Sequence, residues 1–436
     1  MKFYPVTGIT QKGEGVIRMQ GKVCFVPGAL PGEEISICEL KEKKKFSRAR
    51  IQEIRNPDSF RIEPECPQYS RCGGCVWQHV QYEKQLVFKQ EIIRQQMQRI
   101  AGLDIEIKPV IGMENPRHYR NKVAWHCIRN KETGALQLGF FHEESHQVVP
   151  LRGCFLPTEE MLAAGEELER GAEFYGLQEQ DEIILRVSSQ DDTFLLAVCR
   201  SFERRGKKQV EHAEALQNIG QLQAKVPRLE SICIIENGKL RTTAGKGYQI
   251  QRLAGCTFQI SAPSFFQTNF EQTEKLYQLV RETVGISKPK KILDAFCGAG
   301  TISCMLAKDG HEVTGIESNP SAVADAEKNN LRNQTNIEFI CAPCEEGIAR
   351  MKQRFDVVVL DPPRSGCMRG TLEAILQKQP EKIIYVSCEA STLARDVKIL
   401  YEAGYHVQMV QPVDMFPYTA HVETVAVLSR INQNFS

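Results

Sequence analysis

Cys388 has surroundings that could make its thiol nucleophilic. It ends the apolar run Lys382-Ile-Ile-Tyr-Val-Ser-Cys388, and a helix is expected to start near Ser391. The first turn of a helix carries partial positive charge and free backbone donors, and both favour a thiolate. The alternative is a buried structural cysteine, the usual role of a free cysteine, in a chain that has 16 of them. Residue type and position predict covalent catalysis, with the structural alternative still open.

Three other strand ends carry residues suited to a nucleoside-containing cofactor. One strand ends in Asp294-Ala-Phe-Cys-Gly-Ala-Gly300, whose glycines let the backbone turn tightly and approach a ligand. The next ends at Glu317, where a carboxylate can accept both hydroxyls of an adenosine ribose. An NAD site would prefer a third glycine where this chain has Ser303. A later strand ends in Asp361-Pro-Pro-Arg364, a rigid turn that resembles class I methyltransferases acting on nucleobases or RNA. Each end alone could be a structural turn, but their order predicts S-adenosylmethionine as cofactor.

A cysteine cluster near residue 70 has the composition of a metal site. Cys66, Cys72 and Cys75 place three thiols within ten residues, and Gly73-Gly74 permits a tight loop. A fourth ligand is required. Four thiolates suit a [4Fe-4S] cluster or tetrahedral zinc. Zinc sites more often use two short paired knuckles, so the single triplet favours the cluster, and a metal-free group of thiols is the remaining alternative.

The strand ends that carry these residues belong to an alternating pattern after residue 255. Near-continuous Val, Ile and Leu runs separated by helical segments indicate a parallel sheet covered on both faces. Ligands of such sheets bind at the carboxyl ends of the strands. Residues 256–436 are therefore predicted to form an α/β, Rossmann-like domain. The runs are Lys291–Phe296, Glu312–Glu317, Ile337–Cys341, Phe355–Asp361 and Lys382–Cys388.

The preceding residues are predicted to form two further domains. Residues 1–57 alternate short β-like runs with Gly and Pro turns, which indicates a small OB-like β-barrel of five strands. Within it, residues 41–50 hold six cations and one acid, with Phe46 available to stack on a base. That run could contact RNA or form a solvated loop, and the sequence does not decide between these two interpretations. Residues 58–255 are mixed, with a helix expected over 82–100, and indicate an α+β domain.

Composition sets the wider limits. A chain of 436 residues is long enough for two or three domains. Lys and Arg number 55 against 54 Asp and Glu, so any basic surface must be local. The sequence shows no signal-peptide pattern and no apolar run of membrane-spanning length, and its 16 cysteines are scattered. We expect a cytoplasmic, monomeric protein with no membrane partner, whose cysteines serve as thiols, ligands or catalysts.

The motifs together resemble the RNA uracil-5-methyltransferase family, and the N-terminal barrel resembles the TRAM domain of that family. This resemblance implies a class I methyltransferase fold for the C-terminal domain, with Cys388 as nucleophile and Glu423 as general base. It also implies that Gln267, Phe296, Glu317 and Asp361 bind the cofactor, Gln267 at the target base or the cofactor. The motifs are Pro263-Ser-Phe-Phe-Gln267-Thr-Asn269, Asp294-Ala-Phe-Cys-Gly-Ala-Gly300, Asp361-Pro-Pro-Arg-Ser-Gly366, Tyr385-Val-Ser-Cys388 and His421-Val-Glu423-Thr.

The chemistry explains why such an enzyme needs both residues. C5 of uracil is a poor nucleophile, but a thiolate added at C6 makes an enolate whose C5 can attack a sulfonium methyl group. A base must then remove the C5 proton so that the thiolate can leave, and burial beside the base would raise the basicity of Glu423.

The cysteine cluster resembles the iron-sulfur members of the same family. That resemblance implies Cys154 as the fourth ligand, a [4Fe-4S] cluster, and 23S rRNA as the substrate. One departure is that the loop Cys341-Ala-Pro-Cys-Glu-Glu346 has no acid at the expected adenine contact. The alternatives are a tRNA uracil-5-methyltransferase and an RNA-binding protein with an inactive methyltransferase fold. The presence of Cys388, Glu423 and Asp361 argues against an inactive protein.

Overall fold

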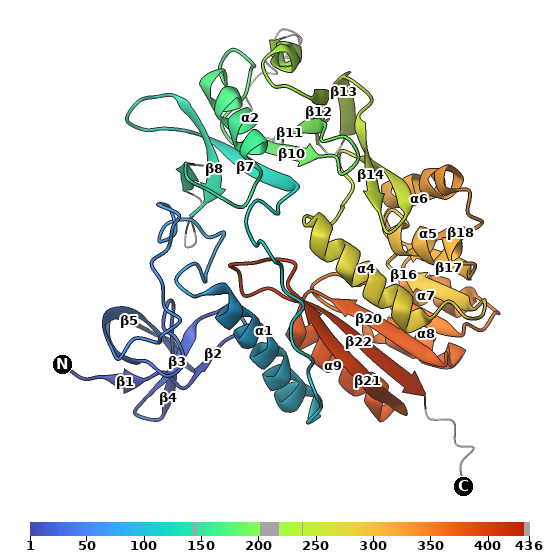
Figure 1. Cartoon of the computed structure of the whole chain (residues 1–436), viewed down its shortest axis with the longest axis horizontal. Helices are drawn as coiled ribbons and strands as arrows, with labels where there is room; N and C mark the ends of the chain where they lie inside the picture. Colours follow the sequence, from blue (N-terminus) through green and yellow to red (C-terminus); the bar gives the residue numbers. More distant parts are fainter. Residues whose placement is uncertain (143–144, 146, 151, 201–217, 238, 431–436) are drawn as a thin grey trace. The chain divides into compact units, whose positions relative to one another are not determined.

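The computed structural model describes the chain except residues 143–144, 146, 151, 201–217, 238 and 431–436. The chain groups into two compact units, each built from segments distant in sequence (Figure 1). The predicted domain limits after residues 57 and 255 are not the limits of these units and stay a prediction. Unit 1 comprises Met1–Glu65, Gly74–Glu114 and Met351–Ser436, and unit 2 comprises Cys66–Gly73 and Asn115–Arg350.

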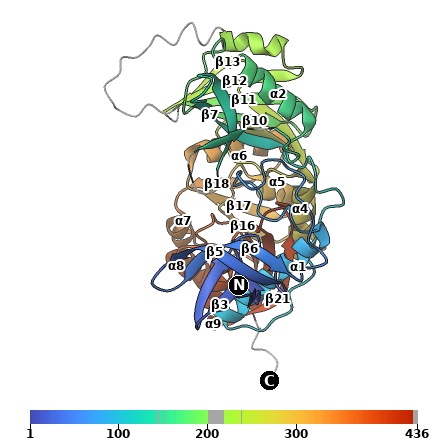
Figure 2. The same ribbon diagram turned by 90° about the vertical axis from the view of Figure 1, so that its left-hand side faces the viewer.

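Unit 1 begins with a six-stranded sheet of order β1-β5-β6-β4-β3-β2, whose strands β3, β5 and β6 lie together in Figure 2. Side chains alternate, so that Ile17, Val26 and Ile35 are fully buried on the inner face. The short β-like runs expected in residues 1–57 are confirmed as strands, although the sheet has six strands where five were expected, and closure into a TRAM-type barrel stays a prediction. The strands are β1 (Tyr4–Pro5), β2 (Gly8–Ile9), β3 (Gly15–Met19), β4 (Lys22–Val26), β5 (Glu34–Glu42) and β6 (Ser47–Arg55).

The basic run occupies the turn between β5 and β6. Lys43, Lys44 and Lys45 are exposed. Phe46 is half-buried, with its ring centroid 5.4 Å from that of Phe25, so it is less available for a base than expected. The run therefore offers lysine charge to a partner more readily than an aromatic face.

The rest of unit 1 combines helices with four strands of order β19-β20-β22-β21. Helix α1 (Tyr82–Gln96) continues into a π-helical turn over Met97–Ala101, confirming the helix expected there, and packs against α9 (Ala390–Glu402), as Figure 1 shows. β19 and β20 are parallel, whereas β22 is antiparallel to both β20 and β21. The remaining elements are β19 (Val357–Leu360), α8 (Arg369–Lys378), β20 (Lys382–Ser387), β21 (Tyr405–Val413) and β22 (Glu423–Arg430).

Unit 2 contains a seven-stranded sheet of order β13-β12-β11-β10-β7-β8-β9, with α2 (Glu159–Arg170) packed on it. Trp125 is fully buried in the core between them. A Cβ atom at Gly165 of α2 would come within 2.9 Å of that indole, so the small residue allows the close approach. The strands are β7 (Lys122–Arg129), β8 (Leu136–Phe141), β9 (Val148–Pro150), β10 (Glu182–Val187), β11 (Phe194–Arg200), β12 (Leu229–Glu236) and β13 (Lys239–Ala244).

The second half of unit 2 has the expected alternation of strand and helix. The strands β18-β17-β16 are parallel and neighbour one another in that order. A hairpin of β14 (Tyr248–Leu253) and β15 (Cys256–Ser261) precedes them. The other elements are α4 (Phe270–Val284), β16 (Lys291–Ala295), α5 (Thr301–Lys308), β17 (Glu312–Glu317), α6 (Pro320–Asn333), β18 (Glu338–Cys341) and α7 (Cys344–Arg350).

Helix side chains cap the free edge of this hairpin. The backbone N–H groups of alternate residues in β15 donate to α6: Gln259 to Asn329 at 2.6 Å and Thr257 to Asn333 at 2.9 Å. The Ser261 hydroxyl donates to Asp325 at 2.6 Å. This arrangement satisfies an edge that would otherwise be unpaired. None of the helices in the described part of the chain combines the length and apolar character needed to cross a membrane.

Candidate active site

The turn after β16 contains three residues whose backbone has a left-handed conformation. Phe296, Gly298 and Gly300 have φ values of 65°, 55° and 75°. A Cβ atom at Gly300 would lie 2.8 Å from the ring of Phe339, so only glycine fits at the start of α5. The turn gives a ligand close access to backbone, as the motif predicted.

Asp294, at the end of β16, is a buried acid with one oxygen left for a ligand. The hydroxyl of Ser303 donates to its Oδ2 at 2.5 Å. Its Oδ1 has no hydrogen-bond partner among the described residues. Burial raises the pKa of this carboxyl to about 7. An orphaned buried oxygen is unusual and marks a place for a donor from a bound molecule. The sequence reasoning missed Asp294 as a site residue, although Ser303 was noticed as a departure from the NAD pattern.

Glu317 lies at the end of β17, as predicted, and joins two turns. Its carboxylate accepts the backbone N–H of Gly298 at 3.2 Å and that of Asn319 at 2.7 Å. It also accepts the Ser318 hydroxyl at 3.3 Å. A carboxylate has about four acceptor positions, so capacity remains for a ligand hydroxyl. The donors and acceptors present therefore fit an adenosine ribose.

Gln267 is buried in the loop between β15 and α4. Its backbone carbonyl accepts a hydrogen bond from the side-chain amide of Asn121 at 3.0 Å. Two residues later, Asn269 caps α4 by accepting the N–H of Gln272 at 3.2 Å. The loop is thus fixed at both ends in unit 2. Asn121 was not found from the sequence, because it is 146 residues away from Gln267.

In unit 1, the Asp361-Pro-Pro turn is held to α9 by a residue that the sequence did not reveal. Fully buried Asp396 accepts the N–H of Cys367 at 2.8 Å and the Tyr385 hydroxyl at 2.6 Å. A Cβ atom at Gly366 would meet Asp396 at 2.7 Å, so glycine is needed where the turn meets the helix. These contacts fix the backbone that follows Asp361.

Cys388 and Glu423 lie at neighbouring strand ends in unit 1. Cys388 directly follows β20, and Glu423 is the first residue of β22. The antiparallel register pairs Ser387 with Thr424, which places the next residues, Cys388 and Glu423, opposite each other. Two residues 35 positions apart in sequence thereby share one strand edge.

The electrostatics join these two residues to the Asp361 turn. Burial, followed by the charge of Glu423, raises the pKa of the Cys388 thiol to about 12. Burial, followed by Asp361, raises the pKa of Glu423 to about 8. Arg364 opposes both shifts. Desolvation and two carboxyls act against the thiolate that the helix start favours, and activation of Cys388 by that helix stays a prediction. The raised basicity expected for Glu423 agrees with its shift.

Comparisons with known proteins identify the family of the chain. A family model described as tRNA (Uracil-5-)-methyltransferase matches residues 247–431. A Bacillus cereus protein named "Uncharacterized RNA methyltransferase" is 36% identical over 98% of this chain and 95% of its own length. A Clostridium tetani protein of the same name is 34% identical over 97% and 95%. The chain belongs to the RNA (uracil-5-)-methyltransferase family.

A solved structure supports the same assignment for the fold. The crystal structure of Pyrococcus abyssi tRNA (uracil-54, C5)-methyltransferase in complex with S-adenosyl-L-homocysteine has a TM-score of 0.74. It is 26% identical and covers 98% of this chain and 100% of its own. The protein is therefore an S-adenosylmethionine-dependent RNA (uracil-5-)-methyltransferase with the corresponding fold.

In this methyltransferase, helix α1 holds the loop that leads into Glu423. Buried Lys89 forms an ion pair with buried Asp414. The Tyr82 hydroxyl donates to the other oxygen of Asp414 at 2.8 Å. Gln85 accepts the N–H of Tyr418 at 2.9 Å. Three polar side chains on one helix thus fix residues 414–418, a role that spacing in the sequence did not indicate.

The cysteines of the methyltransferase are partly assembled in unit 2. Burial, with contributions from Cys66 and Cys72, raises the pKa of the Cys154 thiol to about 11, so these three thiols are near one another. Cys75 belongs to unit 1. No three His, Cys, Asp or Glu side chains in the described part of the chain are arranged to hold a metal ion. The metal ligands therefore stay a prediction.

Proposed function

We propose that the enzyme methylates C5 of a uridine in RNA through a covalent bond between Cys388 and C6. The observation that supports this best is that Cys388 and Glu423 lie opposite each other at neighbouring strand ends, with Asp361 and Arg364 near enough to act on the pKa values of both. A nucleophile and a base at one site are what the reaction requires.

The residues act in sequence. Cys388 loses its proton to solvent and forms the S–C6 bond, which moves the C5–C6 electron pair into an enolate. S-Adenosylmethionine supplies the methyl group, as a sulfonium, to C5. Glu423 then takes the C5 proton, the C6–S bond breaks, and the Cys388 thiolate is released. Because its pKa is about 8, Glu423 is a stronger base than an ordinary carboxylate.

The cofactor is assigned to the strand ends of the parallel sheet. Glu317 would accept the ribose hydroxyls, and Phe296, in the left-handed turn, would lie against the cofactor. Gln267 and Asp361 would complete the site. Asp294 adds a carboxylate oxygen that is open to a donor on the cofactor. These carboxylate acceptors are suited to the amino and hydroxyl groups of S-adenosylmethionine, which donate.

The proposed substrate is 23S rRNA, and tRNA is the second candidate. The cysteine pattern and the N-terminal sheet favour rRNA through the resemblance given above. The similarity to an enzyme acting on position 54 of tRNA favours tRNA. Mass mapping of methylated uridines in both RNAs, from cells with and without the gene, decides between them. Loss of 5-methyluridine from 23S rRNA is expected, and loss from tRNA alone would contradict the rRNA assignment.

A [4Fe-4S] cluster held by Cys66, Cys72, Cys75 and Cys154 is also part of the proposal. The sequence pattern and the proximity of three of these thiols support it. Protein purified without air is expected to be brown and to carry about four irons per chain. Cys154→Ser should lose the iron, whereas Cys341→Ser, at an exposed cysteine, should keep it. Stoichiometric zinc without iron would contradict the cluster.

We further propose a monomeric, cytoplasmic enzyme. None of the 16 cysteines, all of which lie in the described part of the chain, is joined in a disulfide, which suits a reducing compartment. Light scattering of the purified enzyme at increasing concentration tests the monomer, and a mass twice that of the chain would contradict it.

The covalent step has a direct test. RNA with 5-fluorouracil at the target should be methylated once and then trapped, because fluorine cannot leave C5 as a proton. Cys388→Ala should form no adduct, whereas the exposed-cysteine control Cys341→Ala should form it normally. A denaturing gel with labelled RNA measures both. Turnover by Cys388→Ala would contradict the mechanism.

A further inference from the structure

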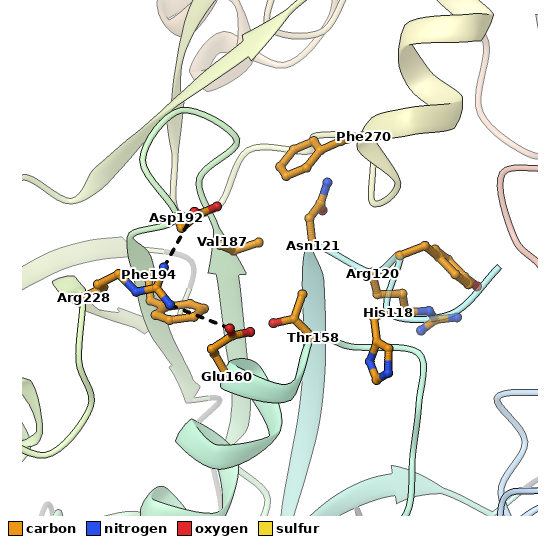
Figure 3. A pocket seen from close by; sticks show the side chains of 11 residues that line it. His118, Arg120, Asn121, Thr158, Glu160, Val187, Asp192, Phe194, Arg228 and Phe270 are labelled. Carbon is orange, nitrogen blue, oxygen red and sulfur yellow. Dashed lines mark ion pairs between the residues drawn. The ribbon is translucent and has the colours of Figure 1, made fainter. Parts of the chain in front are cut away.

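A cavity lies in unit 2, and none of the residues that line it is among those assigned above to catalysis or to the cofactor. It has a volume of about 230 Å³ and opens between the start of β7, the first turn of α2 and the strands β10 and β11. Figure 3 shows Asn121, Val187, Thr158 and Phe270 around one open space. Pockets for drug-sized ligands start at about 300 Å³, so this cavity suits a smaller group, such as one heterocyclic base.

The floor and rim of the cavity differ in character. Asn121, Val187 and Phe194 are buried and form an apolar floor with one amide. Phe270 is half-buried, so part of its ring can receive a flat ligand. Unpaired RNA bases are recognised by stacking on aromatic rings and hydrogen bonding at their edges. The amide of Asn121 and the ring of Phe270 supply those two contacts.

The charges at the rim favour a neutral group over a phosphate. Arg228 lies 3.8 Å from Glu160 and 3.7 Å from Asp192, and Figure 3 marks both ion pairs. All three side chains are substantially exposed, so these pairs are weak and the guanidinium can turn towards a ligand. The lining holds two arginines, Arg120 and Arg228, and two carboxylates, Glu160 and Asp192, so it has no excess of positive charge for a phosphate, whereas an uncharged base would meet hydrogen-bonding groups of both kinds.

The backbone around the rim is strained. His118, Asp192 and Arg228 all have positive φ values, of 52°, 56° and 64°. Such conformations are costly for residues with side chains and gather at functional sites. The strain is independent of the cavity and its charges, and it also points to binding.

One wall of the cavity is shared with the loop that carries Gln267. Asn121 donates its side-chain amide to the Gln267 carbonyl at 3.0 Å, and its backbone N–H to Thr268 at 3.0 Å. Phe270 directly follows the same loop. An occupant of the cavity would therefore lie beside the loop assigned to the target base or the cofactor.

We propose that this cavity binds one unpaired base of the RNA substrate, close in sequence to the methylated uridine. The inference rests on the proposed function, since it takes Gln267 as part of the methylation site. The base would stack on Phe270 and hydrogen bond to Asn121 and Arg228. The enzyme would thus recognise its target by a second extruded base as well as by the uridine.

The test combines a variant that blocks the cavity with RNA that lacks the base. Glu160→Trp places a large side chain at the rim, and Glu159→Trp, one residue earlier and exposed, does not line the cavity. The probe is an RNA oligonucleotide spanning the mapped uridine, with an abasic site at each neighbouring position in turn. Binding is measured by filter retention with S-adenosylhomocysteine present.

One abasic position is expected to weaken binding to the wild type about tenfold, the effect of losing one stacked base. Glu160→Trp and Phe270→Leu should weaken binding of intact RNA about tenfold and be insensitive to that same position. Glu159→Trp should behave as wild type. Equal sensitivity of wild type and Glu160→Trp at every position would overturn the proposal, and so would an equal loss in Glu159→Trp.

The fluorouracil adduct separates this inference from the function on which it rests. At saturating RNA, Glu160→Trp should still form the adduct, because Cys388 is unchanged. No adduct in the wild type would remove the proposed function. A normal wild-type adduct together with unchanged RNA binding by Glu160→Trp would remove only the second base site.

Discussion

Two buried carboxyls, one in each unit, are held in opposite ways. Asp294 is 1% exposed and Glu423 is 5% exposed, and burial raises their pKa values to about 7 and about 8. Asp294 accepts a hydroxyl hydrogen bond from Ser303. For Glu423 no side-chain hydrogen bond acts on the pKa, which burial raises first, then the charge of Asp361, against Arg364. A carboxyl that orients a ligand profits from a fixed donor, whereas one that exchanges a proton is more basic without one.

The largest expected effect comes from removing the proton acceptor. Glu423→Gln should lower turnover by about 10²- to 10⁴-fold, the range for loss of a general base. It should still attack and transfer the methyl group, and so accumulate a covalent complex on ordinary RNA. Denaturing gels measure the complex. A variant that turns over normally would show that Glu423 does not take the C5 proton.

Asp414 is a third buried carboxyl, and it differs from Asp294 and Glu423 because it forms an ion pair with buried Lys89. Lys89→Met leaves Asp414 buried without its cation, which should lower the free energy of unfolding by about 3–5 kcal/mol. Lys89→Met combined with Asp414→Asn should recover part of that loss. Denaturant unfolding followed by circular dichroism measures both, and a single variant as stable as wild type would show that the pair does not stabilise the helix contact.

The pH dependence of turnover should follow Glu423. Its pKa in the folded protein is about 8, above the ordinary value of 4.5, so the basic form is scarce at neutral pH. Where proton removal limits the rate, turnover should rise about tenfold per pH unit below pH 8 and level off above it. Stability should change in the opposite sense, because ionising a buried acid disfavours the folded state as pH rises towards 8. In Glu423→Gln the trend in turnover should disappear, and the trend in stability should weaken to the part that Asp294, whose pKa is also raised, contributes up to about pH 7. A flat wild-type profile between pH 6 and 8 would contradict the assignment.

The smallest effect is expected at the acid that is fixed by a donor. Asp294→Asn keeps the shape and can still interact with Ser303, so we expect about tenfold weaker binding of S-adenosylmethionine, from one lost charged hydrogen bond. The chemical step should change little. Isothermal titration with the cofactor, beside single-turnover kinetics, separates the two. A larger loss in the chemical step than in binding would place Asp294 nearer to the reaction.

Site residues at the strand ends could be predicted from the sequence, but the side chains that hold the neighbouring loops in place could not. The residues Glu317, Asp361 and Cys388 could be found because each follows a continuous apolar run. Their supports could not, since Lys89 and Asp414 are 325 residues apart and nothing in their spacing relates them. The raised pKa of Cys388 could not be predicted from the sequence for a similar reason. The helix start is visible in sequence, but burial beside Glu423 depends on how two strands pair.

The contacts between β15 and α6 also fix the register of the strand against the helix. Asp325, Asn329 and Asn333 are four residues apart on the helix, which corresponds to about 6 Å between successive side chains. Ser261, Gln259 and Thr257 are two residues apart on the strand, a step of about 6.6 Å. The spacing of the helix side chains nearly equals that of the strand residues, so α6 can contact every second residue of β15 and thereby fixes its register. A shift of β15 by one residue would break all three contacts together, and a one-residue insertion in this strand would therefore misplace the Gln267 loop that follows it.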